Sequence, residues 1–212
     1  MEKMRQRFMP EYQENVAFQR QSQDAKPKKY RTRRSRSKSD DDDDEARIGH
    51  VEGVKIGQVF EKRKDLSDAG VHTPLYAGIS GNSKHGAFSI VVSGKYEDDI
   101  DEGDTIYYTG AGGRVDSFGN SGPQTEDQSF EHLQNKWLLM SWELGTSVRV
   151  SRGSGGHSKY APTTGYRYDG LYDVVDREHI KGKSGFKICR FTLKRHVEAD
   201  RISRSGEYRR PS

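Results

Sequence analysis

Short runs of β-branched and aromatic residues, each bounded by Gly, Asn or Asp, constrain the fold of this chain more than any other feature of its sequence. Residues of these types favour strands, and the flanking residues favour tight turns. EGD at 102–104 and GKSG at 182–185 separate such runs and predict hairpins. The predicted strands are KIGQVF (55–60), AFSIVVSG (87–94), DTIYYTG (104–110), SVRVSRG (147–153), LYDVVDR (171–177) and FKICRFTLKR (186–195).

Beyond the N-terminal region, helical signals are confined to two segments. Residues 125–145 begin with Thr125, a residue type that caps helices, and place apolar side chains at helical spacing before Gly145. Residues 62–70 predict a short helix that ends at Gly70. Many short strands with one or two flanking helices indicate the α+β class, built around a curved β-sheet or barrel.

Charge is concentrated near the N-terminus. The segment KPKKYRTRRSRSK (26–38) holds eight cations and no anion, and the acidic run 40–45 follows it directly. Residues 1–45 show little apolar periodicity, so we expect a disordered basic and acidic tail with a short helix near 9–22; residues 199–212 form a second tail. The basic run is either solvated surface or an arm for nuclear import or nucleic-acid contact.

The composition limits the class of protein. Only 31% of the residues are hydrophobic and 32% are charged, which favours one ordered domain, residues 46–198, between the tails. The single cysteine, Cys189, excludes an intramolecular disulfide and fits a reducing compartment. No apolar run is long enough to span a membrane, and the N-terminus lacks the apolar stretch of a secretory signal, so we expect a soluble intracellular protein.

The sequence motifs of common catalytic sites are missing. The chain has no GxxxxGK[ST], HExxH or CxxC, and GAGGR (110–114) lacks the spacing of a dinucleotide-binding turn. The seven histidines show no metal-ligand spacing, and the carboxylates of 97–104 are most simply solvated. We therefore expect neither an enzyme nor a bound cofactor or metal.

Within the predicted domain, basic and acidic residues are equal in number but separated along the chain. YEDDIDEGD (96–104) is densely acidic, whereas residues 181–195 carry six cations and no acid. A neutral domain with one basic face can bind nucleic acid, because phosphates respond to the local potential. Such a charge run is more often ordinary solvated surface.

Several blocks together resemble a known family. In order, they are GVKIGQVF (53–60), GVHTPLYAGISG (70–81), SGNSKHGAFSIVVSGKYEDDIDEGD (80–104), YYTGAGGR (107–114), SKYAPTTGYRYDGLYDVV (158–175) and GKSGFKICRFTLKR (182–195). They are similar to the SRA (SET- and RING-associated) domain, also named YDG after the tripeptide that is Tyr168-Asp169-Gly170 here. The resemblance covers about residues 46–197. It implies a PUA-like curved β-barrel or sheet that reads 5-methylcytosine in double-stranded DNA by flipping the base into a pocket.

The resemblance assigns the pocket residue by residue. It implies that Tyr96 and Tyr108 stack on the flipped base, and that Asp99 accepts a hydrogen bond from the N4 amino group of cytosine. On the residues alone, each tyrosine is more simply a core or cross-strand residue. Backbone groups around Gly94 and Thr109 would read the rest of the base edge, and the small residues at the 5-methyl group would be Ser93 and Ala111.

The resemblance also places DNA contacts outside the pocket. It implies that one loop, with Leu75 and Tyr76, enters a groove, where Tyr76 fills the gap left by the base. The second loop holds Asn120, Ser121 and Gly122 where animal members carry an arginine finger, so we expect relaxed strand and context selectivity. We expect the YDG tripeptide to form a turn beside the pocket, in which Asp169 holds loop backbone. The expected phosphate contacts are Arg63, Arg114, Lys159 and Arg167.

The sequence thus predicts a monomeric, nuclear reader of methylated DNA, with chromatin proteins as further partners. Two alternatives stay open. The chain could be the DNA-targeting module of a larger modification-dependent nuclease or chromatin-modifying transferase. It could also bind RNA, which the Arg-Ser-rich tail would suit.

Overall fold

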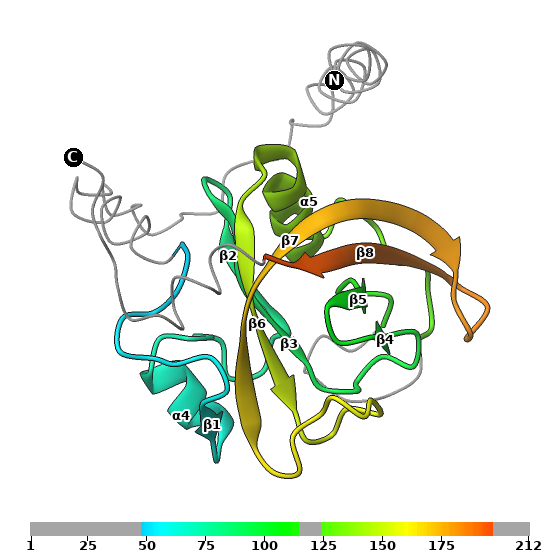
Figure 1. Cartoon of the computed structure of the whole chain (residues 1–212). Coiled ribbons are helices and arrows are strands. Elements are labelled where there is room, and N and C mark those ends of the chain that lie inside the picture. The colour runs from blue at the N-terminus through cyan, green and yellow to red at the C-terminus, as the bar shows by residue number, and fades with distance from the viewer. Residues whose placement is uncertain (1–47, 115–123, 197–212) are drawn as a thin grey trace, which may run out of the picture. The chain divides into compact units, whose positions relative to one another are not determined.

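The computed structural model describes residues 48–114 and 124–196 (Figure 1). The predicted tails and the helix near 9–22 lie outside these residues, and the domain boundaries stay predictions. The strands are β1 (Val59–Phe60), β2 (Ile79–Asn82), β3 (Gly86–Val92), β4 (Ile100–Asp101), β5 (Thr105–Thr109), β6 (Ser147–Gly153), β7 (Tyr166–Lys181) and β8 (Lys187–Arg195), and the helices are α4 (Arg63–Asp68) and α5 (Leu133–Leu144).

The strands form one mixed sheet in the order β2-β3-β6-β7-β8-β5-β4, with β1 paired to β7. Among the strands of residues 48–114 and 124–196, only β3 and β6 pair in parallel. The long strand β7 pairs with β6 through its first half and with β8 through its second half, and it arcs across the molecule (Figure 1). The predicted α+β class is confirmed, and the curved sheet is open rather than closed into a barrel.

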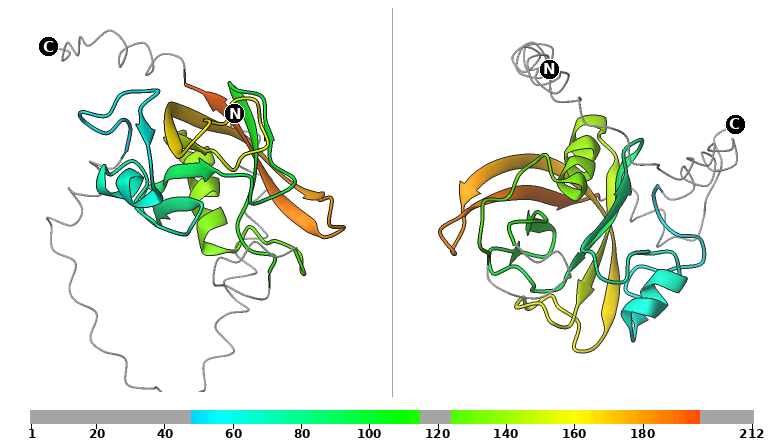
Figure 2. Two further views of the ribbon diagram at one scale, coloured as in Figure 1. Left: turned by 90° about the horizontal axis from the view of Figure 1, so that it is seen from below. Right: turned by 180° about the vertical axis from the view of Figure 1, so that it is seen from behind.

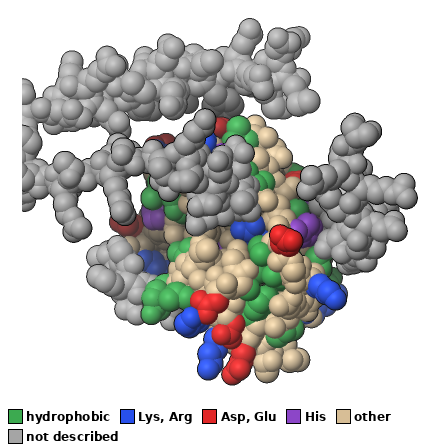
Figure 3. All heavy atoms as spheres, turned by 90° about the vertical axis from the view of Figure 1, so that its left-hand side faces the viewer, with side chains coloured by type: hydrophobic (Ala, Val, Ile, Leu, Met, Phe, Trp, Pro, Cys, Tyr) green, Lys and Arg blue, Asp and Glu red, His purple; other side chains and the backbone are tan. Residues whose placement is uncertain are grey.

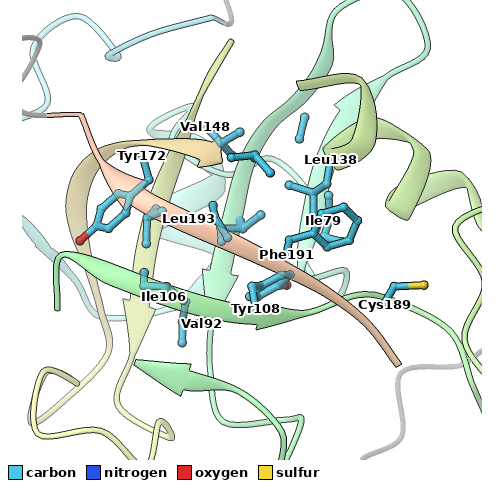
Figure 4. Packing of buried hydrophobic residues seen from close by; sticks show 14 residues of the cluster. Ile79, Val92, Ile106, Tyr108, Leu138, Val148, Tyr172, Cys189, Phe191 and Leu193 are labelled. Carbon is cyan, nitrogen blue, oxygen red and sulfur yellow. The ribbon is translucent and has the colours of Figure 1, made fainter. Parts of the chain in front are cut away.

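The main core lies between the two arms of this curved sheet, of which one is formed by β2, β3 and β6 and the other by β8, β5 and β4. Ile106 and Leu193 from one arm pack in the same cluster as Val92 and Val148 from the other (Figure 4). Helix α5 lies against β2, β3 and β7 and adds the fully buried Leu138 to this cluster (Figure 2). A second cluster lies between α4, β1 and β7. None of the helices among residues 48–114 and 124–196 is long and apolar enough to cross a membrane.

The end of helix α5 was predicted correctly, but its start was not. Gly145 ends the helix in the left-handed region, with φ of 68°, as C-terminal glycines do. The helix begins at Leu133 after His132, so the expected cap at Thr125 is wrong. Residues 125–128 bond to other parts of the backbone instead: the Gln128 N–H donates to the carbonyl of Lys187 in β8, and the Thr125 N–H donates to the Gly113 carbonyl.

The predicted hairpins are confirmed, because 102–104 joins β4 to β5 and 182–185 joins β7 to β8. Two local predictions are wrong. The strand expected at 55–60 is reduced to β1, since Gly57 takes a φ of 90° that an extended strand does not have. The YDG tripeptide is not a turn but part of β7, where the register against β6 shifts and Gly170 has φ of 95°. This is the geometry of a β-bulge, which bends a strand.

Candidate functional site

A cavity of about 1050 Å³ opens between the two arms of the sheet and the segment that leads into α5. One wall comes from the end of β3 and the chain after it, and another from β5 and residues 111–114. The opposite wall comes from residues 126–134. Five of the seven predicted base-pocket residues line this one cavity: Ser93, Tyr96, Asp99, Tyr108 and Ala111.

The other two predicted pocket residues, Gly94 and Thr109, lie directly behind this lining. The Thr109 N–H donates a hydrogen bond to Asp99 Oδ1 at 2.8 Å. Gly94 has φ of 72° and borders a smaller cavity of about 570 Å³ that shares Tyr96 and Asp99 as a wall. A Cβ at Gly94 would lie 2.3 Å from the Gly155 carbonyl oxygen, so only glycine fits.

Asp99 is the predicted base-reading carboxylate of the cavity, and its pKa is shifted. Desolvation raises the pKa of Asp99 to about 7, and the nearby Asp98 and Asp101 act in the same direction. The hydrogen bond from Thr109 favours the ionised form but only partly offsets the burial. The cavity therefore presents a hydrogen-bond acceptor that titrates near neutral pH.

The two tyrosines meet the cavity in different ways. Tyr108 is only 3% exposed and belongs to the main core, so it is both a core residue and part of the cavity wall. Its burial raises the pKa of its phenol well above the ordinary value. Tyr96 is partly exposed, and the Arg114 guanidinium lies 4.8 Å from the centroid of its ring. Arg114 also lines the cavity and donates to the Lys95 carbonyl.

A buried ion-pair network fixes the strand that follows Asp99. Arg152, 2% exposed, binds both carboxylate oxygens of Asp101, at 2.7 and 2.8 Å, and donates to Asp169 Oδ2 at 2.9 Å. Burial opposes the charge on Asp101, but Arg152 outweighs this and holds the pKa of Asp101 below its ordinary value. Asp169 therefore binds arginines, Arg152 and Arg167, rather than loop backbone as expected.

The loop with Leu75 and Tyr76 stands at the mouth of the cavity. Both side chains are exposed, Tyr76 to 81%, and Tyr76 lines the cavity. Arg63 holds the backbone of this loop, because its guanidinium donates hydrogen bonds to the carbonyls of Pro74 and Ala77. An exposed aromatic side chain is thus presented on a well-supported loop.

His72 supports the same loop from inside the fold. Its Nε2–H donates to the Ala77 carbonyl at 3.0 Å, and its Nδ1 accepts from the Ser89 hydroxyl at 2.9 Å. Desolvation, aided by the charge of Arg63, lowers the pKa of His72 to about 3, so the ring is neutral. In the sequence, His72 was one of seven histidines without metal-ligand spacing and received no role; its position just before the loop was the available signal.

The predicted phosphate contacts differ in how strongly they are already engaged. Arg63 holds the loop carbonyls, and Arg167 binds Asp169 and the Tyr160 carbonyl. Lys159 is exposed, with its ammonium 5.1 Å from the centroid of the Tyr160 ring.

The face of the molecule that includes α4 carries acidic and basic side chains side by side (Figure 3). Asn120, Ser121 and Gly122 lie outside the described residues.

The wall formed by residues 126–134 was missed by sequence reasoning. It brings Glu126, Asp127 and Glu131 to the cavity, together with Ser129 and His132. No grouping of histidine, cysteine and carboxylate side chains within 48–114 and 124–196 is arranged to hold a metal ion. The arrangement suits a planar, polar guest that is stacked by aromatic rings and held by acceptors.

Comparison with known proteins identifies this architecture. The SAD/SRA domain family matches residues 47–199. The E3 ubiquitin-protein ligase UHRF1 of Danio rerio is 43% identical over 168 residues, which cover 71% of this chain and 22% of that protein. A UHRF1-like protein of Cryptococcus neoformans is 46% identical over 156 residues, covering 69% of this chain and 45% of that protein. The chain therefore spans less than half the length of these curated relatives.

Solved structures of proteins with similar sequences also resemble this fold. A modification-dependent TagI restriction endonuclease superposes with a TM-score of 0.66 at 41% identity, over 72% of this chain and 54% of that one. The SUVH5 SRA domain bound to fully hydroxymethylated CG DNA superposes with a TM-score of 0.58 at 36% identity, over 70% of this chain and 93% of that one. With the fold, the cavity and the family match in agreement, this chain belongs to the SAD/SRA domain family.

Proposed function

We propose that this chain binds double-stranded DNA that contains 5-methylcytosine and takes the modified base, flipped out of the duplex, into the 1050 Å³ cavity. The observation that carries the proposal is that Tyr96, Asp99 and Tyr108 line one cavity. The solved SUVH5 SRA domains in complex with methylated and hydroxymethylated DNA support it, as relatives of similar structure.

The chemistry of the lining fits a cytosine. A flipped base loses its stacking neighbours at a cost of a few kcal/mol, and aromatic side chains return about 1–3 kcal/mol per base. Asp99 accepts a hydrogen bond from the N4 amino group, which distinguishes cytosine from thymine because thymine has an acceptor there. Ser93 and Ala111 leave room for a small substituent at the 5-position.

Contacts with DNA beyond the flipped base complete the proposed complex. The exposed Tyr76, with Leu75 beside it, occupies the space that the base vacates. Arg114 and Lys159 provide phosphate contacts, which position DNA without reading its sequence. Because residues 117–124 hold no arginine, we propose that discrimination between strands and sequence contexts is relaxed.

The relatives suggest the setting in which such a reader works. They include E3 ubiquitin-protein ligases and a restriction endonuclease, and this chain spans only part of their length. We propose a nuclear, chromatin-associated reader without catalysis of its own. The second candidate is the DNA-targeting module of a larger modification-dependent enzyme, which the similarity to the TagI endonuclease favours.

Fluorescence anisotropy with duplexes that differ only at one cytosine tests the proposal. Cytosine, 5-methylcytosine and 5-hydroxymethylcytosine would be compared in CG and non-CG contexts at fixed salt, with matched RNA as competitor. Tighter binding of modified duplexes is expected, with a rise in fluorescence of a 2-aminopurine placed next to the modified base when that base unstacks. Equal binding of modified and unmodified duplexes, or preference for RNA, would overturn the proposal.

A further inference from the structure

The segment that carries Ala111 into the cavity is not held by a strand. Pairing of β5 with β8 ends at Thr109 opposite Arg190, and the last ladder-like bond runs from the Gly110 N–H to the Cys189 carbonyl at 2.7 Å. Ala111 and Gly112, which follow Gly110, line the cavity beyond this point. The carbonyls of Gly110, Ala111 and Gly112, and the Ala111 N–H, are bonded instead by two buried side-chain amides.

Asn135, on the first turn of α5, is the first of these amides and is fully buried. Its Oδ1 accepts from the Ala111 N–H at 2.7 Å, and its Nδ2 donates to the Ala111 carbonyl at 3.0 Å and to the Ser129 carbonyl at 2.8 Å. The amide thus pairs with both backbone groups of Ala111, as a neighbouring strand would. Helix α5 is thereby connected directly to the cavity wall.

Gln128, 1% exposed, is the second amide. Its Nε2 donates to the carbonyls of Gly110 at 2.8 Å and Gly112 at 3.3 Å, and its Oε1 accepts from the Cys189 N–H at 3.0 Å. It therefore binds the residues on either side of Ala111 to β8. Figure 4 shows Cys189 on β8, on the strand that lies beside Tyr108.

The contact between α5 and this segment is tight. A Cβ built on Gly110 would lie 2.6 Å from Asn135 Oδ1 and 3.0 Å from its Cγ, closer than side chains pack. A methyl group at position 110 would displace the amide or the backbone. The position of Ala111 in the cavity is therefore coupled to the position of Asn135 with little slack.

We infer that Asn135 is a positioning residue that, with Gln128, sets how closely Ala111 approaches the 5-position of the bound cytosine, and so determines which 5-substituents the pocket prefers. This inference rests on the proposed function. The Asn135 amide acts through the backbone of Ala111 and does not line the cavity itself. Loss of the amide would let the segment relax and would weaken discrimination at the 5-position more than overall DNA binding.

Helix α5 offers a matched control. Ser141 is also fully buried and bonds both backbone groups of one residue, because its hydroxyl accepts from the Ala87 N–H at 2.9 Å and donates to the Ala87 carbonyl. Neither Ser141 nor Ala87 lines the cavity. Ser141→Ala therefore removes a comparable clamp from the same helix without touching the cavity wall.

The test measures affinities for cytosine, 5-methylcytosine and 5-hydroxymethylcytosine duplexes, together with thermal unfolding, for the full chain and its variants. For Asn135→Ala, the ratio of affinities for methylated and unmodified duplexes is expected to fall roughly five- to tenfold, the effect of one or two lost hydrogen bonds. Ser141→Ala is expected to lower the melting temperature comparably and leave this ratio unchanged. Gly110→Ala, which disturbs the same contact from its other side, should change the ratio and keeps the test decisive if Asn135→Ala does not fold.

The outcomes distinguish failure of the proposed function from failure of the positioning role of Asn135. If the unaltered chain shows no methylation preference, the proposed function fails. If the unaltered chain prefers methylated DNA, but Asn135→Ala and Gly110→Ala keep the ratio, the inference alone is overturned. A ratio that falls equally in Ser141→Ala would also overturn it, because the effect would then reflect general loss of stability.

Discussion

At the scale of single residues, Asp99 provides the sharpest test of the pocket. Asp99→Asn keeps an oxygen that can accept from the Thr109 N–H, but this orientation turns the amide nitrogen toward the N4 amino group of cytosine. Two donors then face each other, so the preference for methylated DNA should fall by about tenfold or more. Anisotropy at constant salt measures it. Glu97→Gln changes an exposed neighbour and should leave the preference intact; a preference that survives in Asp99→Asn would contradict the assignment.

The raised pKa of Asp99 also predicts how the stability of the chain depends on pH. Because its pKa is raised from 3.8 to about 7 in the folded state, the folded chain binds the extra proton and loses stability as pH rises through this window. Asp99→Asn removes the titration. The melting temperature of the variant, relative to the unaltered chain, should therefore rise between pH 5 and pH 8 and level off above. Calorimetry at several pH values measures the difference, and a pH-independent difference would show that Asp99 ionises normally.

How much of the site could be predicted depended on the kind of residue. Tyr96, Asp99 and Tyr108 lie in sequence blocks typical of the family, so their meeting at one cavity was predictable. The roles of buried polar residues such as Asn135 and Arg152 were not predictable, since Ala111 lies 24 positions from Asn135 and Asp101 lies 51 positions from Arg152. Hydrophobic periodicity locates a core but does not say which buried polar groups bind each other.

At the scale of elements, the ion-pair network around Arg152 should determine the stability of the bent strand β7. Asp169→Ala leaves the fully buried Arg152 with one of its two carboxylate partners missing, and breaking such a pair typically costs about 3–5 kcal/mol. Denaturant unfolding should show a loss of this order. The control is Asp68→Ala, which removes the exposed Lys64–Asp68 pair and should leave stability unchanged within error. Similar losses in both variants would contradict a special role for the network.

Elements were predictable where local pattern and tertiary contacts agree. Strand β6 was predicted with its exact bounds, because a run of residues that favours strands is also buried between β3 and β7, where all of its residues after Ser147 are buried. The segment 125–132 was assigned to a helix because it contains a capping residue and acidic side chains. In the structure its backbone bonds to Gly113 and Lys187, and these distant partners outweigh local helix propensity.

At the scale of the whole molecule, we expect the basic run 26–38 to contribute to DNA affinity, and the domain to recognise the modified base. Basic and acidic residues are equal in number in the predicted domain, whereas 26–38 holds eight cations. We therefore expect this run to strengthen DNA binding without reading methylation. Replacing Arg31, Arg33, Arg34 and Arg36 with Gln should lower the slope of log K against log salt concentration by up to about 3–4, since each phosphate contact contributes about 0.9.

The ratio of affinities for methylated and unmodified duplexes should stay constant in this variant, because both duplexes carry the same phosphates. The matched control replaces the same four arginines with Lys, which keeps the charge and should keep the salt slope. Salt titrations of binding for both duplexes measure slope and ratio together. An unchanged slope would mean that the run does not contact DNA, and a changed ratio would mean that residues 26–38 take part in recognising the modified base.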